Sequence, residues 1–336
     1  MKIRKEPMKM VKISVLFVSV ITMFCFMIPG FILRKLHLAG DSFAKNMSVF
    51  VMCVAQVAML IHSFIFHFDP KVFEGIIWVF ALSLVTHIIF CVLAVTMFKK
   101  APQKLQKSLR FGVIFSNAGY MGIPVINDVF GSEFVIYATI YIVWFNVFAF
   151  SIGRLIYTGD KRYISLRQAI VNPAVIPIMI GLVLYLTGVG GWIQDIVTSD
   201  NTDVMSQTVK VLYNVLTVFK NMVAPASMLV VGARLVGARL KELFSDINAY
   251  KFLLVRHFLF PAVCWGIMKI LSVFGIFTDP AVMAIVLILS STPAAANTTI
   301  FAELYGGDSA YAGKLVALST VISVVTMPIV ALLLYI

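Results

Sequence analysis

Phe115-Ser-Asn-Ala-Gly-Tyr-Met-Gly-Ile-Pro124 interrupts an apolar run in the first half of this chain of 336 residues, and Leu289-Ser-Ser-Thr-Pro-Ala-Ala-Ala-Asn-Thr-Thr299 interrupts another in the second half. Between them, these segments place glycine, proline, asparagine and hydroxyl groups where an uninterrupted membrane helix carries Leu, Ile and Val. Irregular backbone at membrane depth must line a cavity or be buried in protein. Two such segments in corresponding positions of two halves indicate a binding site between membrane helices.

The composition is that of a membrane protein. Hydrophobic residues make up 61% of the chain and charged residues only 12%, whereas roughly 25% of the residues of a soluble domain are charged. The net charge is +12, but the basic residues fall in short connections between apolar runs, which is typical of membrane topology. We therefore expect the lipid bilayer as a partner and no nucleic acid.

Apolar windows of about 20 residues predict an all-α polytopic membrane protein of ten transmembrane helices. The first window continues without a small-x-small cleavage site, so we interpret it as a helix and not as a signal peptide. The expected bounds are 12–33, 44–63, 72–98, 108–128, 133–156, 170–190, 209–233, 250–275, 279–303 and 312–335.

The longest polar connection divides the chain into two sets of five predicted helices. We expect a first five-helix repeat over residues 1–156, a cytoplasmic connection over 157–169, and a second repeat over 170–336. Because five is odd, the second repeat would enter the membrane inverted. A shift of 175 positions supports this, since it places Ser291 on Ser116, Tyr305 on Phe130, Gly306 on Gly131 and Asp308 on Glu133.

The distribution of Lys and Arg predicts the orientation. Basic residues gather in the connections after predicted helices one, three, five and seven, and the alternate connections hold mostly acids such as Asp69, Asp195 and Asp279. The positive-inside rule then predicts a multi-pass protein of the plasma membrane with both termini extracytoplasmic. The basic tail, residues 2–12, argues for the opposite side, and a missed or extra helix is the alternative. We expect Arg234 and Arg256 to snorkel to the cytoplasmic face.

The first interrupted segment predicts an opening in a helix. Gly119 and Gly122 remove side chains and Pro124 removes a backbone donor, so the helix is expected to unwind and to restart near Pro124. The restarted helix would direct free N–H groups and a positive dipole end toward the bilayer centre, which suits an anion. Asn117 adds an amide group. The side chains of this site would carry no charge, but the helix dipole would make its electrostatic potential positive.

The second interrupted segment supplies matching groups, and we expect the two breaks, in predicted helices four and nine, to cross near the midplane. The predicted substrate-binding residues of the second break are Pro293, Asn297 and Thr298. The alternative interpretation is that glycine and proline here serve only close helix packing or a kink, as they often do in membrane helices.

Further polar residues are weaker candidates. Additional pocket residues would be Ser116, Gln56, Tyr141 and Asn146, and candidates for ion coupling are Asp128, Glu303 and His87. Each group also has an alternative interpretation. The first group would serve hydrogen bonding between helices, the two acids would lie at the membrane interface, and the histidine would be part of the core. We expect no metal site.

Asn117-Ala-Gly-Tyr-Met-Gly-Ile-Pro124, followed by Phe130-Gly131, resembles the fourth-helix motif of the auxin efflux carrier family, and the stretch from Pro293 to Pro328 is similar to that family's last two helices. The resemblance implies inverted repeats, a scaffold and a transport unit, and a site where two broken helices cross. Plant members carry a second proline where this chain has Thr298, and they have a long hydrophilic centre that is absent here. Compact microbial relatives, which are associated with malate and malonate, are the nearer type.

We therefore expect a secondary transporter that moves a small organic anion, a mono- or dicarboxylate, by alternating access, without enzyme activity or a cofactor. A membrane-embedded sensor or channel is the alternative. A membrane enzyme is a third class, but the connections contain no cluster of His, Asp and Glu, no nucleophile elbow and no phosphate loop. The substrate, coupling to H+ or Na+, and the direction of flux stay open, and a homodimer is compatible with the sequence.

Overall fold

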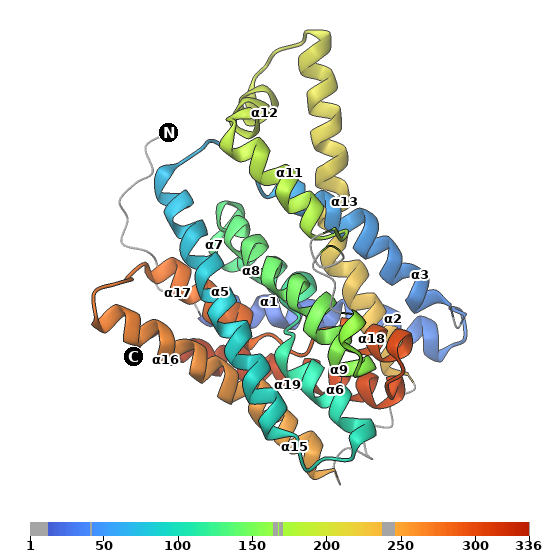
Figure 1. Cartoon of the computed structure of the whole chain (residues 1–336). Helices are drawn as coiled ribbons and strands as arrows, with labels where there is room; N and C mark the ends of the chain where they lie inside the picture. The colour runs from blue at the N-terminus through green and yellow to red at the C-terminus, as the bar shows by residue number, and fades with distance from the viewer. Residues whose placement is uncertain (1–12, 41, 164–166, 168–170, 237–245, 336) are drawn as a thin grey trace.

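The computed structural model describes residues 13–40, 42–163, 167, 171–236 and 246–335 (Figure 1). Within these residues the secondary structure is helical, with turns and short connections between the helices and an isolated antiparallel bridge between Ser116 and Ala294. The prediction of an all-helical, polytopic membrane protein is confirmed. The basic tail, Arg239 and Lys241, which entered the prediction of orientation, lie outside the described residues.

Seven described helices are long and apolar enough to cross a membrane, and they coincide with predicted helices one, two, three, five, seven, eight and ten. They span Ile13–Lys35 (α1 and α2), Phe43–His62 (α3 and α4), Pro70–Met97 (α5), Ser132–Thr158 (α8 and α9), Val204–Leu235 (α13), Ile247–Val273 (α15 and α16) and Ser309–Tyr335 (α19). Their length follows from unbroken apolar sequence, which needs about 20 residues to cross the hydrocarbon core.

The other three predicted helices fall on pairs of shorter helices. These pairs are α6 (Gln103–Ile114) with α7 (Ile123–Phe130), α11 (Val175–Leu186) with α12 (Val189–Thr198), and α17 (Pro280–Ser291) with α18 (Asn297–Tyr305). The predicted end of the sixth helix at residue 190 is wrong: Gly188 adopts a φ of 78° and α12 turns away from α11 by 79°. The total of ten helices in two inverted sets stays a prediction.

Connections of like charge gather at the two ends of the bundle. At the basic end, Lys107 Nζ lies 3.4 Å from the Gly306 carbonyl oxygen and the Arg154 guanidinium lies 5.4 Å from the centre of the Tyr305 ring. At the acidic end, His67 Nε2 lies 2.9 Å from Asp195 Oδ1. The alternation of ends that the sequence predicts is therefore present in the fold.

Aspartates begin several helices and explain part of the charge pattern. The side chains of Asp69, Asp203 and Asp279 accept backbone hydrogen bonds at the starts of α5, α13 and α17. Such N-caps satisfy donors that have no partner inside the helix. The hydrogen bonds from Ser206 hold the pKa of Asp203 below its usual range.

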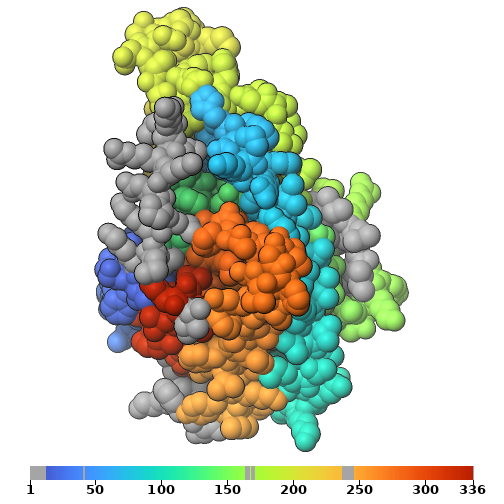
Figure 2. All heavy atoms as spheres, turned by 90° about the vertical axis from the view of Figure 1, so that its left-hand side faces the viewer, coloured from blue at the N-terminus to red at the C-terminus, as the bar shows by residue number. Residues whose placement is uncertain are grey.

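The first half of α13 projects with α12 beyond the other helices (Figures 1 and 2). Many of its apolar side chains are exposed, for example Val211 at 59% and Leu212 at 61%. Exposed apolar side chains on the outside of a helix bundle match contact with lipid.

Two glycines let α2 (Met27–Lys35) approach α13 closely. A Cβ on Gly30 would lie 1.9 Å from the Leu229 carbonyl oxygen, and one on Gly232 would lie 1.9 Å from the Met27 carbonyl oxygen. Small residues are common where membrane helices pack backbone to backbone. This contact fixes α13, which passes the candidate site described below.

We expect Gly232→Ala to destabilise the protein by about 1–3 kcal/mol, because the added methyl group would separate α2 from α13. The measurement is thermal unfolding in detergent. The matched control is Gly266→Ala in α16, where a Cβ meets no atom within 4 Å, so a small stabilisation is expected there. Equal effects of the two substitutions would contradict the packing argument.

Candidate functional site at the crossing of two broken helices

The two interrupted segments lie side by side and pair through their backbones. The Asn117 N–H donates to the Pro293 carbonyl oxygen over 2.7 Å, and the Ala295 N–H donates to the Phe115 carbonyl oxygen over 2.9 Å. These two bonds form the isolated bridge between Ser116 and Ala294. The crossing that we expect between the fourth and ninth predicted helices is thus present in the structure.

The first break lies earlier than predicted. Helix α6 ends at Ile114 and the chain becomes helical again at Ala118, in a π-helical turn that runs to Gly122 and continues into α7. The α-helix α7 begins at Ile123, near Pro124 as expected, but the π-helical turn from Ala118 precedes it, so the chain is helical again before Pro124. Pro124 cannot donate to the Tyr120 carbonyl oxygen, and the Ser227 hydroxyl of α13 lies 3.5 Å from that oxygen instead.

Arg256 holds the helix ends on both sides of the crossing. Its fully buried guanidinium donates from Nη1 to the Val113 carbonyl oxygen over 2.6 Å, from Nε to the Thr292 carbonyl oxygen over 3.2 Å, and from Nη2 to the Ser290 carbonyl oxygen. The last carbonyls of a helix lack partners within it and carry the negative end of its dipole. The expectation that Arg256 snorkels to the surface is therefore wrong.

A hydroxyl group satisfies another backbone group of the second break. The Ala294 N–H donates to Ser319 Oγ over 3.0 Å, and this oxygen lies 2.9 Å from Nε2 of the buried His257. Nδ1 of the same histidine lies 2.9 Å from Thr326 Oγ1. Side chains of α19 and of the turn before α16, Arg256 among them, therefore bind and stabilise the backbone of the second break.

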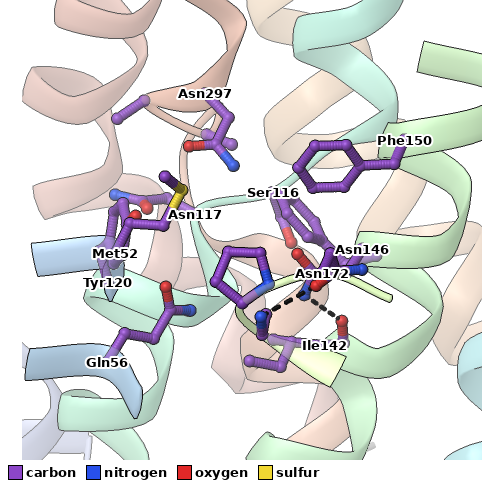
Figure 3. Close-up of a pocket in the computed structure, with 16 residues that line it drawn as sticks. Met52, Gln56, Ser116, Asn117, Tyr120, Ile142, Asn146, Phe150, Asn172 and Asn297 are labelled. Atoms are coloured by element: carbon purple, nitrogen blue, oxygen red, sulfur yellow. Dashed lines mark hydrogen bonds between the residues drawn. The ribbon is translucent and has the colours of Figure 1, made fainter. Parts of the chain in front are cut away.

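A cavity with a volume of about 30 Å³ lies beside the crossing (Figure 3), which is room for about two water molecules. Five amide side chains line it, each from a different part of the chain, and none of the described residues in its lining is charged. The amides belong to Gln56, Asn117, Asn146, Asn172 and Asn297. We call this space the crossing cavity.

Two buried polar groups at the crossing cavity have no hydrogen-bond partner within the described part of the chain. They are Ser116 Oγ and Asn117 Nδ2, on residues that are 1% and 3% exposed. An unsatisfied buried group costs about 1–3 kcal/mol. The crossing cavity therefore retains a donor and a hydroxyl group that a bound polar ligand or water would satisfy.

The four π-helical turns of the described chain all contribute to this region. Those at Val51–Ala55, Ala118–Gly122 and Ala149–Gly153 supply the cavity residues Met52, Gly119 and Phe150, and the turn at Val255–Leu259 supplies Arg256. Such turns redirect side chains and free backbone groups, and they are frequent at functional sites.

Six of the predicted site residues line the crossing cavity: Gln56, Ser116, Asn117, Gly119, Asn146 and Asn297. Their role in binding stays a prediction. Three others lie at the crossing without lining the cavity. Pro293 supplies a carbonyl group to the bridge, Gly122 is close to Leu289, and Thr298 is buried with its carbonyl oxygen 3.0 Å from the Tyr157 hydroxyl.

The remaining candidates lie apart from the crossing cavity. Tyr141 is buried against His87, with 5.4 Å between their ring centres. Nδ1 of His87 lies 2.7 Å from the Ser83 carbonyl oxygen, which makes this histidine a hydrogen-bonded part of the core. Pro124 and Asp128 line a second cavity toward the acidic end, and Glu303 lines a third toward the basic end.

Sequence reasoning missed Asn172 and the aromatic wall of the crossing cavity. Asn172 Oδ1 accepts from the Ala174 and Val175 N–H groups over 2.9 and 3.0 Å and so caps α11. The Asn172-Pro173 pair, at the start of an apolar run, was the available signal. The sequence contained no signal for the aromatic wall, formed by Tyr120, Phe145 and Phe150, because aromatic residues are common throughout the chain.

A family model described as Membrane transport protein matches residues 161–331, which is half of the chain. The chain belongs to this family. The family is that of the auxin efflux carriers, so the resemblance seen in the sequence is confirmed. The chain is accordingly a membrane transport protein and not a member of an enzyme family. No curated protein matches the chain.

We expect Arg256→Gln to destabilise this membrane transport protein by at least about 2 kcal/mol, because it removes charge-assisted hydrogen bonds and leaves buried carbonyls without donors. The stability of Arg256→Lys should lie between those of the wild type and Arg256→Gln, because an ammonium group lacks the planar fork that reaches three carbonyls. Thermal unfolding in detergent measures both.

The matched control is Arg162→Gln, because the Arg162 side chain is 91% exposed. A loss of stability as large as that of Arg256→Gln would show that the effect comes from charge in general and not from the crossing.

Proposed function

We propose that this protein is a secondary transporter that carries a small organic anion, a mono- or dicarboxylate, through the crossing of the two broken helices. The observation that supports this most is the crossing cavity, where an unpartnered amide and hydroxyl group lie beside two helix starts. The restarted helices at Ala118 and at Asn297 both begin at this cavity. Helix N-termini attract anions through free N–H groups and the helix dipole.

The chemistry of the lining suits an anion that must also be released. Amide groups and helix dipoles bind a carboxylate through hydrogen bonds, and the absence of a fixed charge in the lining avoids an ion pair that would hold the substrate. The crossing cavity holds only about two water molecules. Binding of a carboxylate therefore requires the helices around it to separate, as alternating access does.

The topology follows from the same proposal. The three interrupted helix pairs would each cross the membrane, which gives ten helices in two inverted sets. The basic end would face the cytoplasm by the positive-inside rule, and the protein would reside in the plasma membrane. Arg256 occupies the carbonyls at the crossing, so it supplies there the positive charge that a bound Na+ supplies in other transporters with broken helices.

We expect saturable uptake of one carboxylate by liposomes that contain the purified protein, tested with malate, malonate, oxalate, lactate and indole-3-acetate. Charge movement and tracer exchange together detect electrogenic and electroneutral flux, and repetition with a sodium or pH gradient identifies a coupling ion. Ligand-dependent thermal stabilisation without flux would favour a sensor, and flux without saturation or counterflow would favour a channel.

We expect Asn117→Ala to abolish this uptake without lowering thermal stability, because the amide nitrogen that it removes has no partner in the protein. The matched control is Asn214→Ala, at an exposed position of α13 outside the cavities. Normal uptake by Asn117→Ala would move the substrate site away from the crossing.

A further inference from the structure

Two larger cavities flank the crossing cavity, one toward each end of the bundle. The acidic-end cavity has a volume of about 310 Å³ and lies between α1, α7 and α13. The basic-end cavity has a volume of about 450 Å³ and lies between α2, α13, α18 and α19. Helix α13 therefore borders both cavities.

Each flanking cavity contains a basic residue of α13 and an acidic residue of a broken helix. The acidic-end cavity contains Lys220 and Asp128, and the basic-end cavity contains Arg234 and Glu303. Three further basic residues, Arg34, Lys45 and Lys314, line the basic-end cavity from other elements. Asp128 lies near the end of α7 and Glu303 near the end of α18. Glu303 follows Asp128 by 175 positions, which is the shift that relates the two interrupted segments.

The two basic residues lie symmetrically about the crossing. Ser227, whose hydroxyl approaches the Tyr120 carbonyl oxygen at 3.5 Å, is seven positions from Lys220 and seven from Arg234. Seven residues of helix correspond to a rise of about 10 Å. One basic group thus lies about two helix turns beyond the crossing on either side.

Neither base is paired with the acid of its cavity. Asp128 Oδ2 accepts from the Ser19 hydroxyl over 2.7 Å, and Lys220 Nζ lies 3.4 Å from Nδ1 of His62. Arg234 has buried Nε and Nη1 atoms without a hydrogen-bond partner among the described residues, and the Glu303 carboxylate acts on its charge without bonding to it. A partly desolvated cation with unused hydrogen-bond donors binds a carboxylate favourably, and a guanidinium does so with two parallel bonds.

We propose that Lys220 and Arg234 form two anion subsites for a small carboxylate, one on each side of the crossing, and that Asp128 and Glu303 keep these subsites weak. The proposal rests on the proposed function. A carboxylate that arrives from one end binds the base of that cavity before it reaches the crossing. Repulsion from the acid nearby then limits its residence, which a transport path requires because each subsite must release its ligand.

The test uses the carboxylate that the wild-type protein transports, in right-side-out and inside-out membrane vesicles. We expect Arg234→Gln to raise the half-saturation concentration about tenfold for substrate presented at the basic end, and Lys220→Gln to do the same at the acidic end. Glu303→Gln and Asp128→Asn should lower this concentration on their own sides. Arg234→Lys, which keeps the charge but loses the planar fork, should raise this concentration less than Arg234→Gln does.

The matched controls remove one exposed basic charge from each end: Lys161→Gln at the basic end and Lys71→Gln at the acidic end. Thermal unfolding of every variant separates loss of folding from loss of binding. Unchanged half-saturation in both base variants, or equal shifts in their controls, would overturn the two subsites while leaving the proposed function intact. A wild-type protein that moves none of the carboxylates would instead refute the proposed function itself.

Discussion

Backbone polar groups that are released where a membrane helix breaks must find partners inside the protein, because lipid offers none. The two breaks of this chain meet that requirement largely through each other, with two backbone hydrogen bonds across the bridge at Ser116 and Ala294. The carbonyls that remain at the ends of α6 and α17 are bound by Arg256. Packing of the surrounding helices, the crossing cavity and its unpartnered amide all depend on this arrangement.

The electrostatics of the region follow from where charge is placed. A positive guanidinium lies at the helix ends behind the crossing, the helix starts face the crossing cavity, and the described residues that line this cavity are uncharged. Fixed bases and acids are found only farther out, in the flanking cavities, among the described lining residues. An anion would thus meet one base and one acid in the acidic-end cavity, four bases and one acid in the basic-end cavity, and dipoles in the middle. Weak binding at several successive places favours passage over tight binding.

Much of the site could be predicted from residue types at membrane depth. Asn117, Asn297 and Gln56 stand out because amides are costly in lipid, and the structure does place them around one cavity. Expectations based on neighbouring residues failed where a partner far away in the sequence decides the position of a break or the burial of a side chain. The position of the first break depends on Ser227 and on the bridge to Pro293, and the burial of Arg256 depends on carbonyls contributed by two other helices, so neither could be read from neighbouring residues.

The sequence by itself determined the membrane class, the seven continuous helices and the alternation of basic and acidic ends, because apolar length and charge in the connections act locally. Only the tertiary structure decided that the two breaks pair, that α12 turns away from α11 and that α13 borders both flanking cavities. These features arise from contacts between segments more than 100 positions apart, such as Val113 with Arg256 and Tyr120 with Ser227. No local pattern encodes which backbone groups will meet across such distances.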